Sequence, residues 1–249
     1  MGNRVFRYDV KEALTCDPER KADSAGMKAL TDKHLAIFRR HMVDVIGIHA
    51  ELSSEEIGKS ELDARVMAVM EEVPRHLFVP APVASAAYED MPLPIGFNKT
   101  ISQPFMVALM TDLLDPQPDD RVLEVGTGLG YQTAILAHLV AHVWTVDIVE
   151  EFVESAEKRL KHVGIENVTI RLGDGSRGWV EHAPFDKILV AAAAKEVPKA
   201  LLAQLKPGGR LVMPLGPAED QRLSAISKSA DNAVDVRPIM PVRFSELET

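Results

Sequence analysis

A glycine-rich turn in the middle of the chain carries the strongest chemical signal in the sequence. Gly126, Gly128 and Gly130 follow a run of β-forming residues and open a stretch with helical periodicity. Glycines let the chain turn tightly and let a ligand approach the backbone, while a helix start supplies free N–H groups. Tyr131 stands where the dinucleotide fingerprint has its third glycine, which disfavours NAD and FAD. The turn therefore predicts a site for another nucleotide-type cofactor, although a plain strand-to-helix connection is the alternative.

Two acidic residues follow the next two predicted strands. Asp147 comes 21 residues after Gly126, where a carboxylate can accept hydrogen bonds from both hydroxyls of a ribose. Asp174 ends the strand after that, where it can meet the edge of an adenine. As alternatives, Asp147 is an N-cap of the following helix and Asp174 is a turn residue. Three such features at three successive strand ends favour a ligand pocket, because open parallel sheets bind ligands there.

A parallel sheet is the element that brings these residues together. Short β-rich runs alternate with helical stretches after residue 118, which predicts an α/β fold: a Rossmann-like, doubly wound, mostly parallel sheet with helices on both faces. The predicted strands cover residues 121–125, 143–147, 168–172, 187–191 and 210–213, with a closing pair at 223–227 and 234–242. The predicted helices between them cover residues 131–139, 150–163 and 197–205.

The first part of the chain is less regular. Residues 1–30 are polar and mixed in charge. Apolar residues then recur at helical spacing from residue 31, and Gly47 is expected near the end of that helix. Residues 74–104 hold six prolines, which argues against regular structure there and favours a shaped surface loop. Two further helices are predicted, over residues 60–72 and from about residue 104.

Composition bounds the class of protein. The 249 residues are 46% hydrophobic and 26% charged, which is typical of a chain that folds around its own core. The net charge is −9. Residues 51–249 alone carry −11, because residues 1–50 hold nine Lys and Arg against seven Asp and Glu. This acidity argues against nucleic acid as a partner, because proteins that bind nucleic acids neutralise phosphates with Lys and Arg.

Several kinds of site and location are not expected. Cys16 is the single cysteine, so neither an internal disulfide nor a cysteine zinc site is predicted, which fits a reducing, cytoplasmic setting. His138 and His142 lack a third ligand, so no metal is predicted. Residues 1–10 lack the apolar core of a signal peptide, and the apolar run 188–194 is far shorter than the ~20 residues that span a bilayer. Neither secretion nor membrane binding is therefore predicted.

The set of features at the strand ends resembles the class I S-adenosylmethionine-dependent methyltransferases. This resemblance implies S-adenosyl-L-methionine as the cofactor, and it implies a methyltransferase domain over residues 51–249 preceded by a partly helical extension, residues 1–50. It also implies a set of cofactor-binding residues around the turn and the strand ends: Glu124, Gly126, Thr127, Gly128, Gly130, Asp147, Ile148, Asp174 and Gly175.

Segments outside the cofactor motif resemble the protein-L-isoaspartate O-methyltransferases. The most specific is Thr-Ile-Ser-Gln-Pro at residues 100–104, which is not a general methyltransferase feature. The resemblance covers roughly residues 60–249. Its other segments lie at residues 73–80, 87–90, 92–96, 173–175, 178–179, 183–186 and 241–244.

This second resemblance implies an enzyme that methylates the carboxylate of L-isoaspartyl residues in damaged proteins and peptides, and so initiates their repair. Such a carboxyl group has an ordinary pKa near ~3.9 and is already ionised at neutral pH, so no general base is needed. Ser102 takes the catalytic serine position of the family and can donate its hydroxyl to the carboxylate. Thr100, Ile101 and Gln103 are implied to bind the substrate. An N-cap for the helix near Pro104 is the alternative role of Ser102.

The chain also departs from the family pattern. Residues 96–99, Gly-Phe-Asn-Lys, replace the usual glycine- and glutamine-bearing approach to Thr100. Leu129, Ala192 and Ser245 stand where serine, threonine and valine are common. Two alternatives therefore stay open: a carboxylate methyltransferase for a dedicated peptide or small acid, and a catalytically silent scaffold that binds the cofactor. The sequence predicts no oligomeric state.

Overall fold

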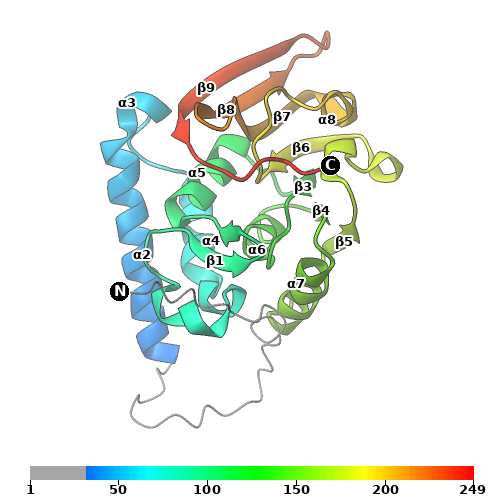
Figure 1. Cartoon of the computed structure of the whole chain (residues 1–249). Coiled ribbons are helices and arrows are strands. Elements are labelled where there is room, and N and C mark those ends of the chain that lie inside the picture. The colour runs from blue at the N-terminus through cyan, green and yellow to red at the C-terminus, as the bar shows by residue number, and fades with distance from the viewer. Residues whose placement is uncertain (1–31) are drawn as a thin grey trace, which may run out of the picture.

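A seven-stranded sheet organises the computed structural model, which describes residues 32–249 (Figure 1). The strand order is β5-β4-β3-β6-β7-β8-β9. The first five strands in this order are parallel, and β8 and β9 add to one edge as antiparallel neighbours. The strands are β3 (Arg121–Val125), β4 (His142–Asp147), β5 (Val168–Leu172), β6 (Phe185–Val190), β7 (Leu205–Leu215), β8 (Gln221–Lys228) and β9 (Val234–Val242).

The position of β3 explains where a ligand can bind. β3 pairs with β4 on one side and with β6 on the other, so the chain reverses the direction in which it builds the sheet at this strand. Connections leave the carboxyl ends of β3 and β6 toward opposite sides, and such a switch point opens a crevice in an α/β sheet. The glycine-rich turn begins at this end of β3.

Helices cover both faces of the sheet, as the alternating sequence pattern predicts. The α-helices are α2 (Asp32–Leu52), α3 (Ser54–Ile57), α4 (Ala64–Glu72), α5 (Pro104–Leu114), α6 (Tyr131–Ala137), α7 (Glu150–His162) and α8 (Lys199–Gln204). Short 3-10 helices are η1 (Arg75–Phe78), η2 (Ala81–Ala86), η3 (Gly175–Arg177) and η4 (Val180–His182). A separate hairpin pairs β1 (Leu93–Gly96) with β2 (Lys99–Ile101).

The alternation of side chains along β3 divides the core in two. Val122 packs in a cluster with helices α2, α4, α5, α6 and α7. Leu123 and Val125 face the other way and pack with Trp179 and Leu201. Successive strand residues point to opposite faces, so both layers are filled by one strand. Glu124 must then share the face of Val122, beneath α6.

The structure confirms most predicted elements and corrects two. Gly47 does not end its helix, because α2 continues to Leu52. Met42, Ile46 and Ala50 of this helix are fully buried, and this burial outweighs the ~1 kcal/mol that a helical glycine costs.

The proline-rich segment is more regular than predicted. It contains η1, η2 and the β1–β2 hairpin rather than an irregular loop. The hairpin turns at Phe97 and Asn98, whose φ angles are +50° and +56°. Two consecutive left-handed residues make the tight turn that suits a twisted hairpin. The sequence predicts such a turn only weakly here, because asparagine, which favours this conformation, occupies only the second position. The prediction for residues 1–30 lies outside the described part of the chain, and the proposed boundary at residue 50 stays a prediction.

Candidate active site

A cavity of about 820 Å³ opens at the carboxyl ends of β3 and β4. This volume lies in the range of small-molecule sites, roughly 300–1,000 Å³. The structure brings ten of the predicted site residues to its wall: Thr100, Ile101, Ser102, Gln103, Gly126, Thr127, Gly128, Asp147, Ile148 and Gly175. Three others, Glu124, Gly130 and Asp174, do not line it.

Two glycines are required by the backbone around the cavity. Gly126 has a φ of +95°, and a Cβ there would lie 3.3 Å from the Ala191 side chain. A Cβ on Gly175 would lie only 2.3 Å from Cγ1 of Val125. The loop after β5 therefore packs its bare backbone against β3, and glycine at both positions lets the loops approach the neighbouring strands closely.

Glu124 forms a buried polar network behind the glycine-rich turn. Its Oε2 accepts hydrogen bonds from the hydroxyls of Thr133, at 2.5 Å, and Thr145, at 2.6 Å. Thr127, on the cavity wall, lies 2.7 Å from Thr145 through their hydroxyls. Burial raises the pKa of Glu124 to about 7, against the effect of the two hydroxyl donors. The network links the fully buried carboxyl group to the cavity through threonines.

Asp147 sits on the cavity wall with both oxygens already engaged. Oδ2 accepts a hydrogen bond from Gly128 N at 2.8 Å, and Oδ1 accepts one from Val149 N at 3.0 Å. Burial raises the pKa of Asp147, while these backbone donors and the charge of Lys99 oppose the rise. A carboxylate has about four acceptor sites, so capacity for ligand hydroxyls remains. Val149, not Asp147, takes the N-cap position of α7.

Asp174 is placed differently from Asp147. Its Oδ1 accepts hydrogen bonds from the N and Oγ of Ser176, and its Oδ2 accepts one from Arg177. Partial burial acts to raise its pKa, but these donors outweigh it and lower the pKa. The backbone of Gly175, rather than this carboxylate, lines the cavity. The contact between Asp174 and adenine stays a prediction.

Two buried charged side chains hold the segment that contains Ser102. Arg75, which is fully buried, donates from Nη2 to the carbonyl of Ser102 at 2.7 Å. Asp90 Oδ2 accepts from Gln103 Nε2 at 3.0 Å, and its Oδ1 accepts from Phe105 N at 2.8 Å. Asp90 thus caps α5, and Gln103 rather than Ser102 occupies the N-cap position. Within residues 32–249 the Ser102 hydroxyl has no hydrogen-bond partner, so it is free to meet a ligand.

Sequence reasoning missed the C-terminal strap, residues 240–248, as part of the wall. In Figure 1 this red segment leaves β9 and crosses the ends of the central strands. Gln221 clamps it through two bonds to the Phe244 backbone, at 3.1 and 2.6 Å. Ala193 adds two more, to the carbonyl of Ser245 and from the amide of Leu247, both at 2.8 Å. The motif at 241–244 was visible in the sequence, but its place beside the cavity was not.

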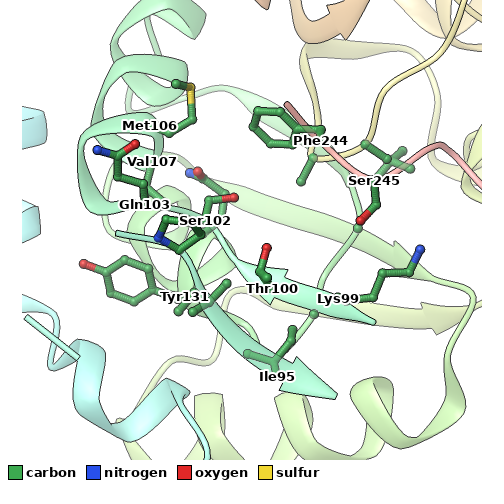
Figure 2. Close-up of a pocket in the computed structure, with 18 of the residues that line it drawn as sticks. Ile95, Lys99, Thr100, Ser102, Gln103, Met106, Val107, Tyr131, Phe244 and Ser245 are labelled. Carbon is green, nitrogen blue, oxygen red and sulfur yellow. The ribbon is translucent and has the colours of Figure 1, made fainter. Parts of the chain in front are cut away.

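Lys99 ties the hairpin to the end of the strap. Its Nζ forms an ion pair with Glu248, and both side chains lie at the cavity mouth. Figure 2 shows Lys99 and Ser245 across the pocket from Gln103 and Ser102. The sequence left Lys99 as either a ligand for acidic peptides or an idle surface charge; the structure makes it a contact between two segments of the wall.

Comparison with known families decides the assignment. A family model described as "Protein-L-isoaspartate(D-aspartate) O-methyltransferase" matches residues 49–248. The chain belongs to this family. This match confirms the resemblance found in the sequence. Ser102, the glycine-rich turn and the strap all lie within the matched residues.

Individual relatives agree. Protein-L-isoaspartate O-methyltransferase 1 of Polaromonas sp. is 51% identical over 219 residues, which cover 88% of this chain and 93% of the relative. Protein-L-isoaspartate O-methyltransferase 2 of Syntrophobacter fumaroxidans is 49% identical over 225 residues, with 90% and 91% covered.

Solved structures confirm the predicted α/β fold. One named protein-L-isoaspartate O-methyltransferase has a TM-score of 0.73 at 26% identity, covering 85% of this chain and 66% of its own. A putative protein-L-isoaspartate O-methyltransferase of Plasmodium falciparum, in complex with S-adenosyl-L-homocysteine, has a TM-score of 0.70 at 23% identity, covering 84% and 98%.

The described residues hold neither a metal site nor a membrane-spanning helix. No group of three or more His, Cys, Asp or Glu side chains in residues 32–249 is arranged to hold a metal ion. Over the same residues, no helix combines the length and apolar character that crossing a membrane requires.

Proposed function

We propose that this protein transfers a methyl group from S-adenosyl-L-methionine to the carboxylate of L-isoaspartyl residues in damaged proteins and peptides, which initiates their repair. Membership of the protein-L-isoaspartate O-methyltransferase family supports the activity. The observation that carries it structurally is that the free Ser102 hydroxyl and the glycine-rich turn line one cavity. A reducing compartment such as the cytoplasm suits the proposal, since the single cysteine cannot form an internal disulfide.

The cofactor half of the cavity fits S-adenosyl-L-methionine. Bare backbone at Gly126 and Gly128 allows close approach, and Asp147 offers acceptor capacity for ribose hydroxyls. Oε1 of Glu124 is buried without a hydrogen-bond partner in the described chain. An unsatisfied buried carboxylate oxygen is costly, so it suits a cationic ligand in the cavity whose ammonium group reaches it through water. When bound, the cofactor supplies an electrophilic methyl group on a sulfonium.

The acceptor half must orient an anion and exclude water. An ionised carboxylate is nucleophilic without a base, so catalysis reduces to aiming one oxygen at the methyl group. We assign Ser102 to donate a hydrogen bond to the other oxygen, and Thr100, Ile101 and Gln103 to frame the acceptor. Arg75 and Asp90 hold this segment before the substrate arrives, which is the preorganisation that electrostatic catalysis requires.

The acidity of the whole molecule must be offset at the point where the acceptor binds. The protein carries −9, which repels an anionic acceptor at long range. Lys99 and Arg243 line the cavity, but Asp147, Glu246 and Glu248 line it too, and Glu248 pairs with Lys99. The sulfonium adds a positive charge when the cofactor is bound. We assign Arg243 and the sulfonium to attract the acceptor within the cleft, where screening by water is weaker.

The test is methyl transfer from labelled S-adenosyl-L-methionine to paired peptides that differ only in an isoaspartyl or aspartyl residue. Label on the isoaspartyl peptide alone is expected. Label on a free carboxylic acid but on neither peptide would favour the small-acid alternative. Cofactor binding with no transfer to any acceptor would favour a silent scaffold and overturn the proposal.

A further inference from the structure

The C-terminal end of α2 reaches the cavity, although none of the sequence motifs includes this helix. His49 and Ser53 line the same cavity as residues 100–103, the acceptor segment. The helix is fixed in place because Met42, Ile46 and Ala50 are fully buried in the main core. His49 therefore holds a defined position beside the start of α5, where its ring meets that of Phe105 edge-on at 5.4 Å between centroids.

One carboxylate connects His49 to the acceptor segment. Nδ1 of His49 lies 2.6 Å from Oδ2 of Asp90. That same oxygen accepts the Gln103 side chain at 3.0 Å, and the other oxygen accepts Phe105 N at 2.8 Å. An ionised carboxylate only accepts hydrogen bonds, so Nδ1 of His49 carries the proton and donates it.

Burial makes Asp90 dependent on its donors. Only 6% of its side chain is exposed, against 40% for His49. A buried carboxylate takes its orientation from the protein groups that bond to it, since little water can replace them. Loss of the His49 donor would leave Oδ2 held by Gln103 alone, and this bond would loosen. Gln103 Nε2 would then depend on its second bond, to the Asp90 carbonyl at 3.1 Å.

We propose that His49 is a positioning residue for methyl transfer: its Nδ1–H orients Asp90, which holds Gln103 and the first turn of α5 and so aims the adjacent Ser102. This inference rests on the proposed function. Arg75 anchors the same segment through the Ser102 carbonyl at 2.7 Å, so the segment is pinned from two sides. α2 is then part of the catalytic machinery rather than a separate appendage.

Two substitutions separate the donor from the ring. His49→Ala removes the Nδ1 donor, and kcat for an isoaspartyl peptide is expected to fall about tenfold, because small misplacements of a catalytic group are costly. His49→Asn places an amide N–H where Nδ1 was, and it should keep kcat within about twofold of the wild type. The dissociation constant of S-adenosyl-L-homocysteine should be unchanged in both. His41→Ala, at an exposed position of the same helix, is the matched control.

Amide hydrogen exchange tests the inference without using activity. In the ligand-free protein, the amide of Phe105 should exchange about tenfold faster in His49→Ala than in the wild type, His49→Asn or His41→Ala. Unchanged exchange and unchanged kcat in His49→Ala would overturn the positioning role. Equal impairment of His49→Asn and His49→Ala would also overturn it, because the ring and not the donor would then matter. If Phe105 exchanges faster in His49→Ala as expected, but the wild type methylates no isoaspartyl peptide, the proposed function alone would be refuted.

Discussion

The two walls of the cavity are built by different means. The wall to which we assign the cofactor, the cofactor wall, consists of Glu124, the turn at residues 126–130, Asp147 and Gly175, all at or behind the ends of neighbouring parallel strands. The wall to which we assign the isoaspartyl substrate, the acceptor wall, consists of His49, residues 99–103 and the C-terminal strap, which come from distant parts of the chain. Sheet pairing positions the first wall, whereas side-chain bonds such as those of Arg75 and Asp90 position the second. The difference predicts that substitutions in one wall leave the ligand of the other wall largely unaffected.

Substitution of Ser102 is the strongest test of this division between the two walls. Ser102→Ala should lower turnover with an isoaspartyl peptide by about 100- to 1,000-fold, because one preorganised donor to a reacting oxygen contributes that much. Turnover is measured by label transfer under saturating cofactor. Ser53→Ala, another serine on the cavity wall, should stay within about twofold of the wild type. Full activity of Ser102→Ala would remove Ser102 from the acceptor wall.

Glu124 tests whether burial of a carboxyl group behind the cofactor wall destabilises the ligand-free protein at neutral pH. Its pKa of about 7 in the folded protein lies above the ordinary value of 4.5, so the folded state keeps a proton that the unfolded state has released. Stability from this group is therefore present below about pH 4.5 and lost as the pH rises to about 7, a total of about 3 kcal/mol.

Urea unfolding of the ligand-free protein at several pH values measures this effect. Glu124→Gln has no proton to release, so the fall in its free energy of unfolding between about pH 4.5 and 7 should be smaller than in the wild type by about that amount. Parallel curves for the two proteins would show that Glu124 does not titrate as the buried network requires.

Substitution of Asp147 tests the same division from the cofactor wall. Asp147→Asn should weaken S-adenosyl-L-homocysteine binding by about 30-fold, because charge-assisted hydrogen bonds to hydroxyls are replaced by neutral ones. Calorimetry gives the dissociation constant directly. The KM for the isoaspartyl peptide, measured at saturating cofactor, should change by less than about threefold. A larger change in peptide KM than in cofactor affinity would contradict the division of the walls.

The smallest effect is expected at the ion pair that joins the β1–β2 hairpin to the strap. Lys99→Met removes the ion pair with Glu248 and should raise the peptide KM by about three- to fivefold at low salt, with less effect at high salt, since partly exposed pairs are weak and screened. Lys158→Met, which breaks the exposed pair with Glu154 on α7, is the control. Equal effects of both substitutions would mean that Lys99 has no special role at the mouth.

How far the sequence predicts the site follows the same division. The spacing from Gly126 to Asp147 predicts that these residues lie together, because strand, turn and helix signals are local and a parallel sheet then aligns the strand ends. The acceptor wall came only from the resemblance at residues 100–104. Periodicity cannot show that Asp90 caps α5, that Gln221 clamps Phe244, or that Lys99 meets Glu248 across 149 positions. Those contacts depend on tertiary packing.

The fold shows a similar limit. Gly47 was a reasonable end for a helix on propensity alone, and only the burial of Met42, Ile46 and Ala50 explains why α2 continues to Leu52 and brings His49 to the cavity. Asp174 illustrates the reverse case. Its position at a strand end was predicted, but the direction of its side chain, toward Ser176 and Arg177, depends on local hydrogen bonds.

Binding of S-adenosyl-L-homocysteine to Ser102→Ala tests the central claim most directly, because it asks whether the cofactor wall works without its partner. Calorimetric titration of wild type and variant is the measurement. Dissociation constants equal within about twofold are expected, alongside the loss of methyl transfer. A variant that binds the cofactor more than about tenfold more weakly would show that the two walls are one cooperative unit, and would contradict their independence.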